Sequence, residues 1–292
     1  MIPKMMTAVL LTGHGDMDKL AWRTDVPVPR PKAGEVLIRV AASAVNNTDI
    51  NTRIGWYSKK VAAATEAGGA TGFADVDDDD ASWSGTPLQF PRIQGADACG
   101  HIVAVGDGVD PARIGERVLV RNMLRFYVDW RPYECWTFGS EVDGGFAQFT
   151  VAPSRETHAV RCDWTDAELA SVPCAYSTAE NMLHRAGVGA ERVLVTGASG
   201  GVGSAAVQLA KRRGAEVIAI CAAAKSDAVR ALGADRTIDR DADLVAMLGR
   251  NSVDAVIDMV GGPGFPALLD VLRPGGRYAV AGAIAGPICD LD

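Results

Sequence analysis

A glycine-rich turn carries the clearest chemical signal in this chain. Gly200, Gly201 and Gly203 come after an apolar, β-rich run at residues 193–196 and before a helical pattern at residues 204–213. Glycines in such a turn let the backbone approach a pyrophosphate, and the helix that follows points unpaired amides and the positive end of its dipole at the phosphates. The order of strand, turn and helix therefore predicts a βαβ unit that binds a dinucleotide. A glycine-rich surface turn is the alternative.

The end of the second strand of this unit, expected at residues 216–220, favours NADP(H) over NAD(H). A unit specific for NAD usually carries Asp or Glu there, and this residue hydrogen-bonds the adenosine ribose. Cys221 occupies that place and Lys225 follows, so the segment offers a cation and no carboxylate to a 2′-phosphate. A solvent-exposed loop lysine is the alternative for Lys225. We expect cofactor contacts from the glycine turn, this lysine and a glycine near the end of the chain: Ser199, Gly200, Gly201, Val202, Gly203, Lys225 and Gly282.

Length and composition indicate two domains and argue against several classes of protein. The 292 residues exceed the usual size of a single domain. The formal net charge is −7, and no basic patch interleaved with aromatic residues is present, so we expect no nucleic-acid partner. The apolar run at residues 5–11 is too short to span a bilayer and is typical of a first strand. These features predict a cytoplasmic protein with no membrane partner.

The six cysteines are scattered and form no CxxC pair. This spacing argues against a disulfide framework and against a structural zinc knuckle. We expect most of these side chains to be small buried hydrophobic groups.

The elements that position these residues divide the chain into a β-rich first half and an alternating second half. Capping boxes at Thr165–Glu168 and Ser177–Glu180 predict two short helices that flank Pro173. Strands that alternate with helices predict a parallel, doubly wound sheet, so the fold class is α/β. A segment at about residues 60–86, with the run Asp77–Asp80, is expected to be a mobile acidic insertion; it is a solvated loop or an active-site lid. The expected strands lie at 36–45, 102–105, 117–120 and 146–151 in the first half and at 193–196, 216–220, 237–238, 253–258 and 277–281 in the second.

Three segments of the first half resemble the medium-chain dehydrogenase/reductase superfamily, which includes the alcohol dehydrogenase-like proteins. The segment GADACGHIVAVGDGV, residues 95–109, is similar to the family pattern GHExxGxxxxxGxxV, and IGERV at 114–118 is similar to GDRV. GGFAQFTVA, residues 144–152, fits the segment that closes the family's barrel. The resemblance implies a GroES-like β-barrel domain at residues 1–160 followed by a Rossmann NADP-binding domain at 161–292. The matching residues of the first pattern are Gly95, Asp97, Gly100, Gly106 and Val109.

The resemblance also bears on zinc, because the zinc members hold a catalytic metal with a Cys, the His of GHE and a further Cys or acid. Here Asn46 and Ala96 stand at the first two positions, and only Cys174 matches the third. A catalytic zinc needs three protein ligands, and an amide and a methyl group do not replace a thiolate and an imidazole. The lobe that holds a structural zinc in many relatives corresponds to residues 121–142 and contains only Cys135. We therefore expect no metal site.

The segment VNNTDINTRIGWY, residues 45–57, resembles the pattern VNPxDxxxRxGxY of the zinc-independent quinone oxidoreductase branch. The resemblance implies that Asn46 and Tyr57 line the cleft beside the nicotinamide, with Tyr57 as the candidate proton donor. An aromatic pair formed by Trp56 and Tyr57 at a hairpin tip is the alternative.

The function implied is NADPH-dependent hydride transfer to a small-molecule quinone, enone or related carbonyl substrate without zinc, since conjugation already makes such an acceptor electrophilic. A zinc-dependent alcohol dehydrogenase and a non-catalytic NADPH-binding protein or truncated remnant are the alternatives. Relatives continue beyond the position of Asp292 with a further strand and helix, so the resemblance implies that the C-terminal part of the fold is missing. It also implies a homodimer in the full-length form.

Overall fold

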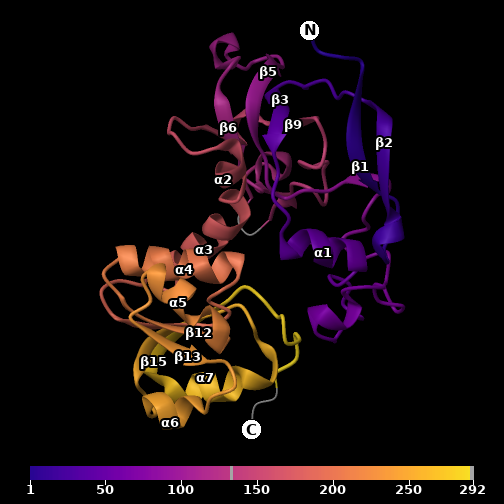
Figure 1. Cartoon of the computed structure of the whole chain (residues 1–292). Coiled ribbons are helices and arrows are strands. Elements are labelled where there is room, and N and C mark those ends of the chain that lie inside the picture. Colours follow the sequence, from indigo (N-terminus) through magenta and orange to yellow (C-terminus); the bar gives the residue numbers. More distant parts are fainter. Residues whose placement is uncertain (132–133, 290–292) are drawn as a thin grey trace. The chain divides into compact units, whose positions relative to one another are not determined.

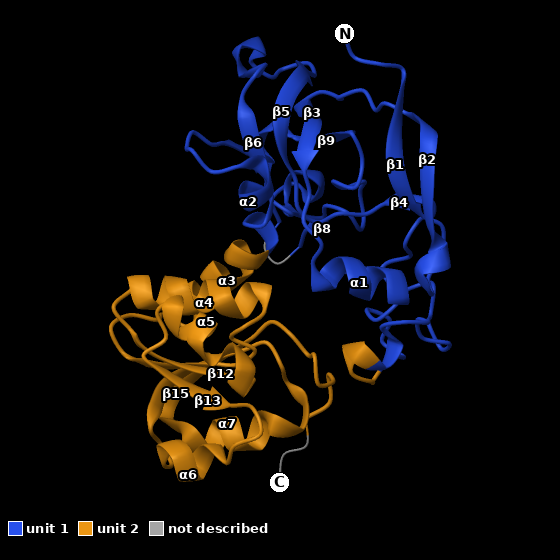
Figure 2. Cartoon of the chain, in the orientation of Figure 1, with its two compact units in different colours: residues 1–61, 67–174 blue, residues 62–66, 175–292 orange. Residues whose placement is uncertain are grey.

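The computed structural model describes residues 1–131 and 134–289. The chain forms two compact units: Met1–Val61 with Ala67–Cys174, and Ala62–Glu66 with Ala175–Asp292 (Figure 2). They are called unit 1 and unit 2. The domain limits expected from the sequence, 1–160 and 161–292, remain a prediction, because the units are defined by packing alone.

Unit 1 contains a five-stranded antiparallel sheet with the order β10-β6-β5-β3-β9 and a three-stranded sheet with the order β2-β1-β4 (Figure 1). Side chains that alternate along β3 and β5, such as Val36, Ile38 and Ile102, are buried in one apolar cluster, as expected for strands with one face on a core. The strands are β1 Met5–Leu11, β2 Leu20–Pro27, β3 Glu35–Ala42, β4 Arg92–Ile93, β5 Cys99–Val105, β6 Arg117–Val120, β9 Phe149–Pro153 and β10 Thr157–Ala159, with β7 Met123–Leu124 and β8 Trp136–Thr137 in a separate pair.

The helix α1 Asn47–Ile54 lies between β3 and β4 in sequence, and the candidate catalytic residues Asn46 and Tyr57 lie just before it and just after it. It begins after Asn46 and ends at Gly55, whose left-handed φ of 74° closes the helix. Unit 1 also contains the helix α2 Asp166–Ala170. The short 3₁₀ turns of the first half are η1 Met17–Lys19, η2 Thr65–Gly68, η3 Pro111–Arg113, η4 Phe126–Val128 and η5 Ser154–Glu156.

Unit 2 is built on a parallel five-stranded sheet with the order β13-β12-β11-β14-β15. One buried cluster packs α3, α4 and α5 on one face, and another packs α6 and α7 on the other (Figure 1). This is the expected doubly wound α/β architecture. Its elements are β11 Arg192–Val195, β12 Glu216–Cys221, β13 Arg236–Asp239, β14 Val253–Asp258, β15 Leu272–Val280, α3 Pro173–Arg185, α4 Gly201–Arg212, α5 Ser226–Ala231, α6 Leu244–Leu248, α7 Phe265–Val271, η6 Ala223–Lys225 and η7 Gly262–Gly264.

Some sequence-based expectations are wrong in detail. Ser177 does not start a helix, because α3 runs without a break from Pro173, whose missing N–H fits the first helical position. The helix after the glycine turn begins at Gly201 rather than Ser204. Tyr57 follows the end of α1 and does not lie at a hairpin tip. In the described part of the chain, no helix is long and apolar enough to cross a bilayer.

Candidate functional site

A buried carboxylate in unit 1 joins two of the residues that the family resemblance singled out. Asp97, with 0% of its surface exposed, accepts a hydrogen bond from Asn46 Nδ2 over 2.8 Å through one oxygen. Its other oxygen accepts from the backbone amide of Cys174 over 2.7 Å. The structure therefore brings Asn46 and Cys174 to a single carboxyl group, although they are far apart in sequence.

A second carboxylate fixes the helix that presents Asn46. Asp49 Oδ1 accepts from the amides of Gly95 (3.1 Å) and Ala96 (3.0 Å), and Oδ2 accepts from the amide of Asn46 (2.8 Å). These bonds tie the first turn of α1 to the loop that precedes Asp97. Burial raises the pKa of Asp49 and of Asp97 to about 6.

This arrangement does not fit a catalytic zinc. Ala96 offers a methyl group, the amide of Asn46 is engaged with Asp97, and both oxygens of Asp97 are occupied by protein donors. Burial raises the pKa of the Cys174 thiol to about 12, so this thiol is protonated at neutral pH. Over residues 1–131 and 134–289, no group of three His, Cys, Asp or Glu side chains is placed to hold a metal ion.

The hydroxyl of Tyr57 forms a hydrogen bond with Thr48 Oγ1 over 2.8 Å. Burial raises the pKa of Tyr57 to about 12, with Asp49 and Cys174 adding smaller electrostatic contributions, so the phenol stays protonated at neutral pH. These contributions place Tyr57 in the same polar cluster as the carboxylates. Thr48 was missed in the sequence, and the available signal was its position two residues after Asn46 at the start of a helix.

The acidic insertion folds back on the segment that carries Tyr57. Val76 packs against Gly55, and Ser58 Oγ accepts a hydrogen bond from the amide of Asp77 over 3.0 Å. Asp77 also pairs with Lys60 Nζ at 2.9 Å. The part of the insertion around Val76 and Asp77 is therefore anchored within unit 1, while carboxylates such as Asp79 face solvent.

In unit 2 the glycine turn connects β11 to α4, as expected from the sequence. Ser199, Gly200 and Gly201 are exposed, and the first backbone bond of the helix runs from the amide of Ser204 to the carbonyl of Gly200 (2.8 Å). The amides of the first helical turn have no partner within the helix and are free to bind phosphate oxygens. A side chain at Gly203 would overlap the carbonyl oxygen of Gly197, so glycine is required for this close turn. These residues fit a bound pyrophosphate.

Three charged groups surround the end of β12. Burial and the carboxylate of Asp239 raise the pKa of the Cys221 thiol, and Arg230 and Lys225 oppose this rise. Lys225 is exposed, and Arg230 Nε donates to Thr237 Oγ1 over 3.0 Å. Sequence reasoning missed Arg230, because it lies a helical turn beyond Lys225 and only the fold brings it back to the strand end.

Asp239 supplies a carboxylate at this end of the sheet that the linear sequence did not reveal. It pairs in register with Cys221, since β13 lies beside β12. Its oxygens accept from the backbone amides of Ala223 (2.8 Å) and Asp241 (3.0 Å). The carboxylate therefore shapes the turn after β12.

Gly282 lies after β15, at the same edge of the sheet as the glycine turn. A side chain there would overlap the carbonyl oxygen of Met259, and Met259 also packs beside Gly197. The predicted cofactor residues thus come together along the carboxyl ends of the strands in unit 2, where doubly wound sheets bind ligands.

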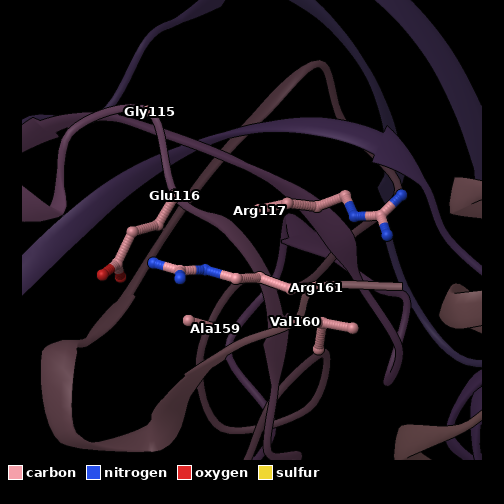
Figure 3. A pocket seen from close by; sticks show the side chains of 6 residues that line it. All are labelled: Gly115, Glu116, Arg117, Ala159, Val160 and Arg161. Atoms are coloured by element: carbon pink, nitrogen blue, oxygen red, sulfur yellow. The ribbon is translucent and has the colours of Figure 1, made fainter. Parts of the chain in front are cut away.

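Unit 1 also has a surface depression of about 350 Å³, which is lined by none of the residues discussed as catalytic (Figure 3). It contains none of the predicted catalytic or cofactor residues, so we do not assign the reaction to it. Its lining consists of Gly115, Glu116, Arg117, Ala159, Val160 and Arg161.

Comparison with known proteins gives two family matches: an alcohol dehydrogenase GroES-like domain over residues 32–162 and a zinc-binding dehydrogenase domain over residues 201–292. A Sinorhizobium meliloti 1021 protein, provisionally described as an alcohol dehydrogenase, has a crystal structure with 47% identity and a TM-score of 0.86; the match covers 100% of this chain and 79% of that one. Human quinone oxidoreductase is 28% identical, with 96% of this chain and 74% of the relative covered. The 2-methylene-furan-3-one reductase of Solanum lycopersicum is 30% identical over 98% of this chain but only 65% of its own length.

Proposed function

Because the chain belongs to the medium-chain dehydrogenase/reductase superfamily, we propose that it is an NADPH-dependent oxidoreductase that reduces a quinone, an enone or a related carbonyl compound without zinc. Relatives named as a quinone oxidoreductase and as a furanone reductase support this class of substrate. One observation carries the zinc-independent part of the proposal. Asp97 binds both Asn46 and Cys174, which occupy two of the positions where zinc members hold their metal.

The residues of unit 2 fit a nicotinamide dinucleotide, which supplies a hydride when bound. The first-turn amides of α4 bind the pyrophosphate, and the turn that begins at Gly197 keeps them accessible. Lys225 and Arg230 supply positive charge for a 2′-phosphate. Thr237 orients Arg230 through its hydroxyl group.

The residues of unit 1 manage charge and protons on the acceptor. Reduction of a conjugated carbonyl compound places negative charge on its oxygen, which hydrogen-bond donors stabilise. Asn46 has two amide hydrogens, of which one is bound to Asp97, and the other is available to such an oxygen. The protonated hydroxyl of Tyr57 is a proton donor, and the Thr48 hydroxyl, which shares a hydrogen bond with it, relays a proton from solvent water back to the phenolate.

Two assays test this proposal. The first follows NADPH oxidation with a panel of quinones, enones and saturated aldehydes, and the second follows NADP+ reduction with primary alcohols. We expect turnover with the conjugated acceptors and none with the alcohols. Zinc-requiring oxidation of the alcohols would instead establish an alcohol dehydrogenase. Tight NADPH binding without turnover of any acceptor would establish a non-catalytic binding protein.

A further inference from the structure

A buried carboxylate at the end of β14 is used by none of the steps above. Asp258 has 0% of its surface exposed. The hydroxyls of Thr196 and Tyr278 donate to its two oxygens, one to each. The backbone amides of Val260 (2.9 Å) and Gly261 (3.1 Å) also donate to it. Its four donors are all neutral.

These bonds connect three loops at the carboxyl edge of the sheet. Thr196 directly precedes the glycine turn, and its hydroxyl also accepts from the amide of Met259 over 2.9 Å. The carbonyl of Asp258 accepts from Ala281 (3.1 Å), and that of Val260 accepts from Ala285 (2.9 Å). The loop after β14 is thereby tied both to the glycine turn and to the loop after β15.

A charge in this position is costly for stability alone. Burying an ionised carboxylate without a cation requires several good hydrogen bonds, and well-packed apolar side chains often replace such groups without loss of stability. Here the carboxylate binds the amide of Gly261, which has a positive φ of 62°, and Gly262 beside it has a φ of 65°. The carboxylate of Asp258 therefore fixes the geometry of the loop after β14.

The strand order assigns this loop to one half of a dinucleotide site. The order reverses between β11 and β14, so β11, β12 and β13 form one mononucleotide half and β14 with β15 forms the other. The glycine turn and Lys225 belong to the first half, which leaves the second half for the nicotinamide mononucleotide. Tyr278 lies on β15 and therefore belongs to the second half of the dinucleotide site.

We propose that Asp258, held by Tyr278, is a positioning residue for the nicotinamide half of the cofactor. This inference rests on the proposed function, because it needs a dinucleotide bound at the sheet edge. The Tyr278→Phe variant removes one hydroxyl donor while it keeps the ring, which contacts Phe265 edge-on with centroids 5.0 Å apart. The second half of the site then loses the hydrogen bond from Tyr278 to Asp258, while the adenosine half of the site keeps all its contacts.

The test compares binding of NADPH and of 2′,5′-ADP by calorimetry, with NADH and ADP in parallel. Loss of one hydrogen bond corresponds to about three- to tenfold in affinity. We expect Tyr278→Phe to weaken NADPH by about that factor and to leave 2′,5′-ADP within about twofold. The fluorescence of bound NADPH, which reports the surroundings of the nicotinamide ring, should move towards that of free NADPH.

Tyr127→Phe is the matched control, since Tyr127 donates to buried Glu35 in unit 1 over 2.7 Å. Tyr127→Phe should change neither the affinity for NADPH nor the affinity for 2′,5′-ADP. Equal losses for NADPH and 2′,5′-ADP in Tyr278→Phe, or no loss for either, would overturn the inference while the proposed function stands. A wild-type protein that binds neither dinucleotide would overturn both. If NADH binds more tightly than NADPH, the same comparison is made between NADH and ADP.

Discussion

Asn46 and Asp97 are joined by a hydrogen bond of 2.8 Å from the side-chain amide to the carboxylate. The same carboxylate receives the backbone amide of Cys174 at the start of α3. Both of its oxygens are therefore occupied by protein donors. Asn46 and Cys174 therefore share one carboxyl partner in unit 1.

Removal of Cys174 should not impair turnover. The Cys174→Ser variant keeps the backbone amide that binds Asp97, so we expect kcat on an enone within about twofold of the wild-type value. Purified wild-type protein should contain no stoichiometric zinc by elemental analysis. Loss of a residue that only orients a metal ligand already lowers metal affinity by about ten- to a hundredfold, and here Asn46 and Ala96 replace two ligands themselves. One zinc per chain, lost in Cys174→Ser together with activity, would contradict this prediction.

Replacement of Tyr57 should separate two classes of acceptor. Tyr57→Phe removes the proton donor but keeps the ring beside Trp56. General acid catalysis contributes about a hundred- to ten-thousandfold, so we expect turnover of an enone to fall within that range. Quinones should lose less, because their reduced form takes protons from solvent. NADPH affinity serves as the control and should be unchanged.

Equal losses on both acceptors, with a lower melting temperature, would instead make Tyr57 a packing residue. Retained activity on the enone would mean that another group donates the proton. The Thr48→Val variant is informative beside it, since it breaks the hydrogen bond to Tyr57 without removing the phenol. We expect Thr48→Val to lower enone turnover less than Tyr57→Phe does.

The preference for NADPH should depend on two cations. Lys225→Ala and Arg230→Ala should each weaken NADPH binding, by about ten- to a hundredfold for a full charge-assisted contact, and leave NADH binding unchanged. Lys211→Ala is the matched control, because Lys211 lies in the last turn of α4 and pairs with Asp235 at 2.5 Å. A full NADPH preference in the Lys225→Ala, Arg230→Ala double variant would show that another group recognises the phosphate.

Two buried carboxyls of unit 1, Asp49 and Asp97, should make stability depend on pH. The pKa of Asp97 is raised from 3.8 to about 6, so the folded protein holds a proton that the unfolded chain releases between these values. The stability contributed by this group is present below about pH 4 and is lost as pH rises through about 6. For one carboxyl the difference is roughly 3 kcal/mol in the free energy of unfolding.

Urea unfolding at pH 4, 5 and 6 measures this effect in the wild type and in Asp97→Asn. The variant has no proton to lose, so its stability should fall less, or rise more, over this window than that of the wild type. Asp49 keeps its own contribution in both proteins, with its pKa also at about 6. Identical slopes in the two proteins would contradict the prediction.

The sequence predicted the parts of the molecule that depend on local pattern. The glycine turn, the α/β class and the strands Met5–Leu11, Arg117–Val120 and Val253–Asp258 follow from runs of neighbouring residues. The start of α3 at Pro173 does not follow from the local pattern, because a capping box inside a helix has the same sequence as one at its beginning.

The contacts that complete the candidate sites could not be predicted, because they join distant parts of the chain. Asp97 and Cys174 are 77 residues apart, and Thr196 and Asp258 are 62 apart. Arg230 and Asp239 reach the end of β12 only because β13 pairs beside it. The order of strands in the sheet decides these neighbours, and a single sequence does not state that order.

Deuterium transfer from NADPH labelled at the reactive C4 position tests hydride transfer without zinc most directly. The protein is first treated with a chelator and its metal content is checked. We predict that the metal-free protein reduces an enone and places one deuterium in each product molecule, at the same rate as untreated protein. Turnover that is lost with the chelator and restored by zinc, or product without deuterium, would contradict the account.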